Sequence, residues 1–176
     1  MLRKLTLKLI KRYIQPIITR AVMRQPDVLI GVNYLARWWL IKNVRDQDTG
    51  DQFSLKKYHR TSNWFNSYLH CVRSNDDDRA LHDHPWLNIS IIISGTYREV
   101  LADRTRLRKP GDIVFRFGGT AHRLEVVEGP VWSLFITGPK YREWGFRCPN
   151  GWKHWKEYTD YYGSGDSTKI GRGCGE

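Results

Sequence analysis

Two segments decide the fold of this 176-residue chain: LHDHP at residues 81–85 and PGDIVFRFGGTAH at residues 110–122. On an extended strand, residues two positions apart point to the same side, so the rings of His82 and His84 can reach one point. Imidazole is a common neutral ligand of zinc, iron, nickel and copper. Because paired surface histidines are common, the pair predicts a metal site only together with His122.

Both segments resemble the two motifs of the cupin superfamily, G-x5-H-x-H-x3/4-E-x6-G and G-x5-P-x-G-x2-H-x3-N. The positions that match are His82, His84, Gly95, Gly111, Gly119 and His122. The resemblance implies an all-β fold, a double-stranded β-helix or jelly-roll barrel. It also implies one divalent ion, which could be Fe, Zn, Ni or Mn, held by the three histidines.

One departure from these motifs concerns the metal. Asn88 stands where the family has a glutamate ligand, and an amide supplies only a neutral oxygen. The site therefore resembles the three-histidine cupins, which include the thiol dioxygenases. Asn88 is a candidate weak fourth ligand or substrate contact, and Ser90 and Trp86 are candidate pocket residues. Trp86 could equally be ordinary core. Asp76, Phe117 and Val126 also depart from the motifs.

A broader resemblance covers residues 75–86, 110–122, 134–139 and 143–155, which look like small uncharacterised cupin-like proteins of tailed phages and prophages. This resemblance implies a source, with the host cytoplasm as the location, and no particular reaction.

The N-terminus, residues 1–26, forms a basic extension. The chain carries a net charge of +11, and every charged residue up to position 24 is basic: Arg3, Lys4, Lys8, Lys11, Arg12, Arg20 and Arg24. Apolar residues recur on one face of residues 2–15, which predicts an amphipathic helix that Pro16 ends or kinks, followed by a short helix over 17–23. We expect it to pack on the domain or in a homodimer interface. Contacts with a membrane surface or with nucleic acid are the alternatives.

Residues 27–162 form the predicted β-barrel domain. Short β-like runs alternate with turn residues, which is typical of an antiparallel sandwich or barrel. The expected strands are 35–41, 64–73, 87–94, 97–101, 112–117, 122–127 and 131–137. The Trp-rich segment 141–158 is expected to be ordered but irregular, and the glycine-rich residues 163–176 to be a loose tail.

The three cysteines, Cys71, Cys148 and Cys174, are widely spaced and contain no CxxC pair. This pattern suggests neither a disulfide framework nor a cysteine zinc site, and a reducing cytoplasm is the simplest compartment. Charges interrupt every apolar stretch, so neither a signal peptide nor a transmembrane segment is expected.

For His70 and for the acidic run 76–78 we expect structural roles rather than functional ones. We expect His70 to be a satisfied core histidine rather than a residue that faces a cavity. The acidic run 76–78 with Arg79 is expected to be a solvated loop in which Arg79 pairs with an acid, although it could also attract a cationic substrate.

Three functions fit these residues. The first is a metal-dependent small-molecule oxygenase, in which the ion binds substrate or dioxygen and no catalytic acid or base can be named. The second is a binding module that captures a small ligand or a protein without turnover. The third is a metal-dependent isomerase or epimerase acting on sugars or nucleotides.

Overall fold

The computed structural model describes residues 2–30, 34–43, 60–62, 64–76, 80–164 and 166–175. Its helical elements are α1 (Leu2–Leu9), η1 (Ile10–Ile14), α2 (Gln15–Val22) and α3 (Trp155–Tyr158). Its strands are β1 (Val28–Ile30), β2 (Leu35–Asn43), β3 (Arg60–Ser62), β4 (Asn66–Val72), β5 (Leu81–His82), β6 (Asn88–Leu101), β7 (Thr105–Arg108), β8 (Ile113–Arg116), β9 (His122–Thr137), β10 (Gly145–Cys148), β11 (Gly151–His154), β12 (Thr159–Asp160) and β13 (Asp166–Ile170).

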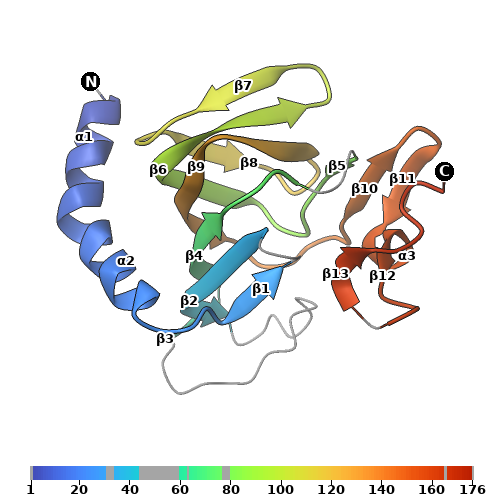
Figure 1. The fold of residues 1–176 in the computed structure, drawn as a ribbon, viewed down its shortest axis with the longest axis horizontal. Coiled ribbons are helices and arrows are strands. Elements are labelled where there is room, and N and C mark those ends of the chain that lie inside the picture. Colours follow the sequence, from blue (N-terminus) through green and yellow to red (C-terminus); the bar gives the residue numbers. More distant parts are fainter. Residues whose placement is uncertain are drawn as a thin grey trace.

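Within the described residues, eleven of the strands form one sheet with the order β1-β2-β4-β9-β5-β10-β11, while β6 joins β7, β8 and β9. The sheet curls on itself (Figure 1), and all its pairs are antiparallel except β2 with β3. Its inward residues alternate with outward ones, most clearly along β8. The expected all-β jelly-roll architecture with an N-terminal helix is confirmed.

The centre of the sheet is the pairing of β6 with β9, two strands that are longer than the sequence predicts. The expected breaks at Ser94-Gly95 and at 128–130 are register shifts inside continuous strands. Gly95 has a φ of 74°, and a Cβ atom there would lie 2.6 Å from the carbonyl oxygen of Pro130. Glycine is therefore required for a bend of β6 against β9.

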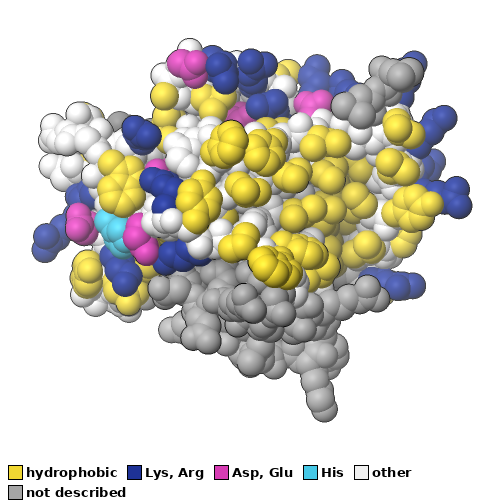
Figure 2. Space-filling view, turned by 180° about the vertical axis from the view of Figure 1, so that it is seen from behind, with side chains coloured by type: hydrophobic (Ala, Val, Ile, Leu, Met, Phe, Trp, Pro, Cys, Tyr) yellow, Lys and Arg dark blue, Asp and Glu magenta, His cyan; other side chains and the backbone are white. Residues whose placement is uncertain are grey.

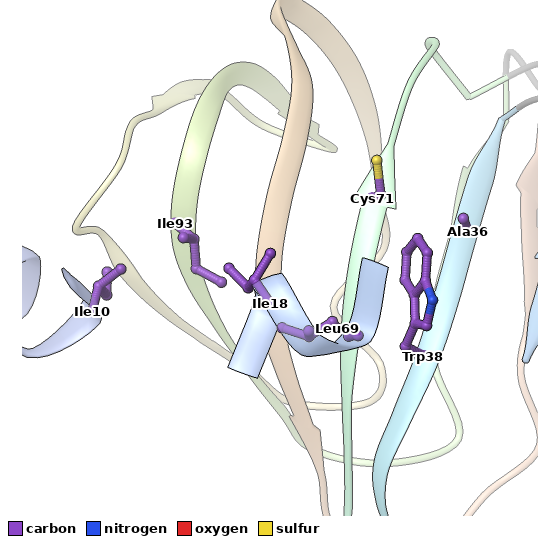
Figure 3. Close-up of a cluster of buried hydrophobic side chains, with 8 residues drawn as sticks. Ile10, Ile18, Ala36, Trp38, Leu69, Cys71 and Ile93 are labelled. Atoms are coloured by element: carbon purple, nitrogen blue, oxygen red, sulfur yellow. The ribbon is translucent and has the colours of Figure 1, made fainter. Parts of the chain in front are cut away.

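The N-terminal helices lie along one side of the curled sheet (Figure 1). Ile10, Ile18 and Ala21 are buried in one apolar cluster with the sheet residues Ala36, Trp38, Leu69, Cys71 and Ile93. Figure 3 shows the isoleucines of the helices directed at this face of the sheet. Because the apolar helix face is buried against the sheet, packing on the domain body is confirmed.

Residues 2–22 form one continuous helical segment rather than two helices. Proline has no N–H and its ring crowds the preceding turn, so the α-helical hydrogen-bond pattern cannot run through Pro16. The wider turn of η1, directly before Gln15 and Pro16, accommodates this change. Pro16 alters the helix without ending it.

The C-terminal region is more regular than expected. Segment 141–158 contains the hairpin of β10 with β11 and the short helix α3. In place of a loose tail, β13 pairs with β12, and Gly171 and Gly173 donate hydrogen bonds to the carbonyl of Tyr158.

The expectation of no disulfide is wrong, because Cys148 and Cys174 are bonded, with their Cα atoms 5.4 Å apart. The chain reversal through β12 and β13 brings the two cysteines together. The argument for a reducing compartment from cysteine spacing therefore loses its basis. Cys71 is free and buried.

One face of the molecule exposes many apolar side chains (Figure 2). Large hydrophobic residues with exposed side chains include Ile113 and Phe115 of β8 and the following Phe117. Within the described part of the chain, no helix combines the length and the apolarity that a membrane crossing requires.

Replacing Ile18 with alanine tests the packing of the helix. Ile18 is 7% exposed and Ile17 is 41% exposed. We expect Ile18→Ala to lower the free energy of unfolding by about 2–5 kcal/mol, because it leaves a cavity under the helix. Chemical denaturation measures this change. Ile17→Ala is the control, with a smaller loss, and equal losses would contradict the packing.

Candidate functional site: a three-histidine cluster

The structure brings His82, His84 and His122 together. Their candidate ligand nitrogens all lie within 4.8 Å of one another, and the three ring centroids are 4.9 to 5.2 Å apart. His82 of β5 is the direct cross-strand neighbour of His122 of β9. His84 follows β5, and its N–H donates to the carbonyl of Gly118, which places it beside the start of β9. The predicted convergence of two distant segments is therefore present.

Two imidazoles of the cluster, those of His84 and His122, are held neutral. The Nε2 atoms of His84 and His122 are 2.9 Å apart. Burial lowers the pKa of His122 to about 4, with the Arg116 charge adding to the effect and the hydrogen bond to Glu99 opposing it. Burial, together with the neighbouring His122 and His82, also holds the pKa of His84 well below its ordinary value. Neutral imidazole nitrogens are the form that binds metal ions.

Glu99 of β6 fixes the orientation of His122. Its Oε1 lies 3.1 Å from His122 Nδ1, so Nδ1 carries the proton that is donated to the carboxylate and Nε2 keeps its lone pair toward His84. Burial opposes ionisation of Glu99. The hydrogen bond from His122 and the charge of Arg116 outweigh it and hold the pKa of this carboxyl well below its ordinary value.

Two arginines compensate the buried Glu99 carboxylate. Arg116 Nε donates to Oε1 at 2.5 Å, and Arg108 Nε donates to Oε2 at 2.6 Å. Arg116 is itself buried and donates to Asn88 Oδ1 at 3.3 Å, Ser90 Oγ at 2.9 Å and the Tyr97 hydroxyl at 3.1 Å. One guanidinium thus connects Asn88 and Ser90 to the carboxylate that orients His122.

Asn88 is fully buried. Its amide oxygen accepts from Arg116, whereas its Nδ2 is buried and has no hydrogen-bond partner in the described structure. The candidate pocket residue Ser90 is also buried beside Arg116. Trp86 stacks on His84 with ring centroids 5.4 Å apart, and its buried Nε1 likewise has no partner.

Asp76 has a different place from the one that the sequence predicted. Instead of lying in a solvated loop, its carboxylate accepts from the Leu124 N–H at 2.7 Å and from the Tyr34 hydroxyl. Its Oδ2 lies 3.7 Å from His82 Nδ1. A carboxylate therefore faces Nδ1 of His82, just as the Glu99 carboxylate faces Nδ1 of His122. The remaining residues of the acidic run, 77–79, lie outside the described residues.

Asp83, between the two paired histidines, points to the other side of the strand. Its buried carboxylate accepts from the Gly145 N–H at 2.8 Å and Trp152 Nε1 at 3.0 Å, and it pairs with Arg142 at 3.0 Å. The strand alternation that directs the two imidazoles inward therefore directs Asp83 to the β10–β11 hairpin.

His70 does not join the cluster. Its Nε2 accepts from Arg37 Nε at 3.1 Å, and its ring lies against Tyr68 and Phe135. Burial, with the nearby Arg37 charge, lowers its pKa well below the ordinary value. The expectation of a satisfied core histidine is confirmed.

Sequence reasoning missed Glu99 and Arg116. Strand alternation offered a signal, because Tyr97 and Glu99 share a face of the predicted strand 97–101 with Leu101. A glutamate and an arginine at inward strand positions would each be costly to bury alone, so together they indicate an interior ion pair.

The cluster fits a divalent metal ion. Two nitrogens bound at about 2.0–2.1 Å to one ion are roughly 2.8–3.4 Å apart for angles between right and tetrahedral. The 2.9 Å between Nε2 of His84 and Nε2 of His122 lies in this range. Metal-binding histidines commonly donate their second ring N–H to a carboxylate, as His122 does to Glu99. The donor chemistry and the supporting hydrogen bond are therefore both those of a metal site.

Comparison with known proteins gives one family match. Residues 65–142 are similar to the AraC-like ligand binding domain. The matching segment contains all three histidines together with Asn88, Glu99 and Arg116. No curated protein sequence matches the chain.

Several solved structures are similar over part of the chain. The DMSP lyase DddQ from Ruegeria pomeroyi DSS-3 is 19% identical, with a TM-score of 0.45 over 60% of this chain and 47% of that one. Ectoine synthase from P. lautus is 12% identical, with a TM-score of 0.44 over 69% and 74%. An RmlC-like cupin family protein from Methanocaldococcus jannaschii, with a double-stranded β-helix fold, is 15% identical, with a TM-score of 0.38 over 45% and 72%. The present chain spans about half the length of the DMSP lyase chain.

Replacing Glu99 with glutamine tests the support of His122. We expect the dissociation constant for a bound divalent metal to rise roughly 10–100-fold, because an amide orients the ring more weakly and leaves the arginines uncompensated. Competition with a metal chelator measures this constant. Glu125→Gln is the control, because Glu125 pairs with Arg98 and Arg123 away from the cluster. An unchanged constant in Glu99→Gln would contradict the role of Glu99.

Proposed function

We propose that this chain binds one divalent metal ion on His82, His84 and His122 and uses it to act on a small molecule inside the barrel. The observation that carries the proposal is the convergence of three imidazoles from two distant segments, with their candidate ligand nitrogens within 4.8 Å. The metal is Fe, Zn, Ni or Mn in this proposal, and imidazole ligands suit Fe, Zn and Ni best.

The surrounding residues have distinct tasks in this proposal. Glu99 keeps the proton of His122 on Nδ1, Asp76 faces Nδ1 of His82, and Trp86 holds the plane of the His84 ring by stacking. Arg116 keeps Glu99 ionised and in place. The bound ion would supply Lewis acidity or a redox centre.

We favour a small-molecule oxygenase among the possible enzymes. Three neutral imidazoles leave the charge of the ion uncompensated and leave room for further ligands, as substrate and dioxygen would require. Glu99 does not serve as the general base in this proposal, because its two carboxylate oxygens already accept hydrogen bonds from Arg108, Arg116 and His122.

A ligand-binding module without turnover is the second candidate. The similarity of residues 65–142 to the AraC-like ligand binding domain favours it. In this case the same three histidines hold a structural ion, and the interior captures a small molecule. Location in the cytoplasm, a homodimer and a phage source stay predictions from the sequence.

Metal analysis of purified protein tests the proposed ligands. We expect about one divalent ion per chain, and the double variant His82→Ala with His122→Ala should lose it, since one imidazole cannot replace three. Elemental analysis by mass spectrometry gives the stoichiometry. His154→Ala is the matched control, because His154 pairs with Glu143 outside the cluster. Retained stoichiometric metal in the double variant would refute the ligand assignment.

Oxygen consumption separates the two candidate functions. For the oxygenase, the iron-loaded protein consumes dioxygen when a small thiol or a 2-oxo acid is its substrate, and the double variant does not. An oxygen electrode records the rate. Binding of such a compound without any oxygen uptake favours the binding module.

A further inference from the structure

Two side-chain N–H groups near the histidine cluster are buried without a partner: Asn88 Nδ2 and Trp86 Nε1. Leaving a buried donor unpaired costs free energy, so such groups beside a candidate site indicate an absent acceptor. Both groups can only donate. The missing partner must therefore offer oxygen or another acceptor.

The two donors lie close together in the sequence, at the start of β6 and in the bend before it. Asn88 and Ser90 are two positions apart in β6 and share its buried side, and Trp86 precedes them in the bend. Trp86 stacks on His84, and Asn88 shares the Arg116 guanidinium with Glu99, which contacts His122. The unpartnered donors are thus linked to two of the three histidines.

The charges around the cluster favour an anion once the proposed metal is present. Arg108 and Arg116 balance Glu99 and Asp76, so these side chains are neutral as a group. The histidine ligands add no charge to offset the ion, whose two positive charges remain uncompensated. A negatively charged ligand removes this imbalance.

We propose that the site binds a small carboxylate whose oxygens accept hydrogen bonds from Asn88 Nδ2 and Trp86 Nε1. This inference rests on the proposed metal function and names its ligand class. The two groups carry three donor hydrogens, a set that the two oxygens of a carboxylate can accept. Phosphate is a poorer match, because Arg116 already donates to Glu99, Asn88, Ser90 and Tyr97 and cannot offer the guanidinium fork that phosphate prefers.

The test is calorimetric titration of the metal-containing protein with pyruvate, with its neutral isostere pyruvamide and with inorganic phosphate. We expect pyruvate to bind at least tenfold more tightly than pyruvamide. Trp86→Phe keeps the ring beside His84 but removes the N–H, and it should weaken pyruvate binding about three- to tenfold. Metal content is measured on every sample.

Asn88→Asp replaces the donor with a carboxylate while it preserves the acceptor for Arg116, and it should weaken pyruvate binding more than tenfold. Asn66→Asp is the matched control. Asn66 is also buried, but its Nδ2 already donates to Thr137 Oγ1 at 3.2 Å. Pyruvate binding should stay within a factor of two in that variant, with folding checked by circular dichroism.

The outcomes separate this inference from the proposed function. Equal binding of pyruvate and pyruvamide, or binding of phosphate alone, would overturn the carboxylate. If metal is bound and none of the three compounds binds, water satisfies the two donors and the inference fails while the metal site stands. If the protein holds no metal, the proposed function itself fails.

Discussion

The interior of this protein is organised by the need to compensate one buried carboxylate. Glu99 lies on the longest pairing of the sheet, β6 with β9, in an environment where an isolated charge would be very costly. Arg116, Arg108 and His122 each contact it. The same compensation sets the tautomer of His122 and places the guanidinium that holds Asn88 and Ser90. The orientation of His122 and the positions of Asn88 and Ser90 therefore depend on one ion-pair network.

Much of the fold could be predicted from alternation and turn chemistry, because strands with one buried face leave a period of two in the sequence. Turn chemistry gave the wrong prediction where a glycine can either form a tight turn or bend a continuous strand. Gly95 has the left-handed conformation of a tight turn, yet it bends a continuous β6. The pairing of Cys148 with Cys174 was also hidden, because it depends on a chain reversal between them that no spacing rule describes.

The site was predictable to the extent that local spacing determines it. His82 and His84 were expected to share a strand face, and their motif offsets placed His122 with them; in the structure the three side chains lie together. Asp76 and Glu99 escaped prediction because their roles come from tertiary neighbours: the Leu124 N–H and the Tyr34 hydroxyl for Asp76, and two arginines for Glu99. A sequence indicates which side chains face inward, but pairing between distant inward charges requires the registers of several strands at once.

The position of His82 and His84 also depends on Asp83, the residue between them. The Asp83 carboxylate binds Gly145, Trp152 and Arg142. Residues 82–84 therefore present two imidazoles on one side and hold the β10–β11 hairpin on the other. A shift of the strand by a single residue would exchange these two sides. The His-Asp-His segment therefore cannot be transferred to another barrel by itself. In a barrel without an equivalent of β10 and β11, the carboxylate of Asp83 would be buried without its hydrogen-bond partners.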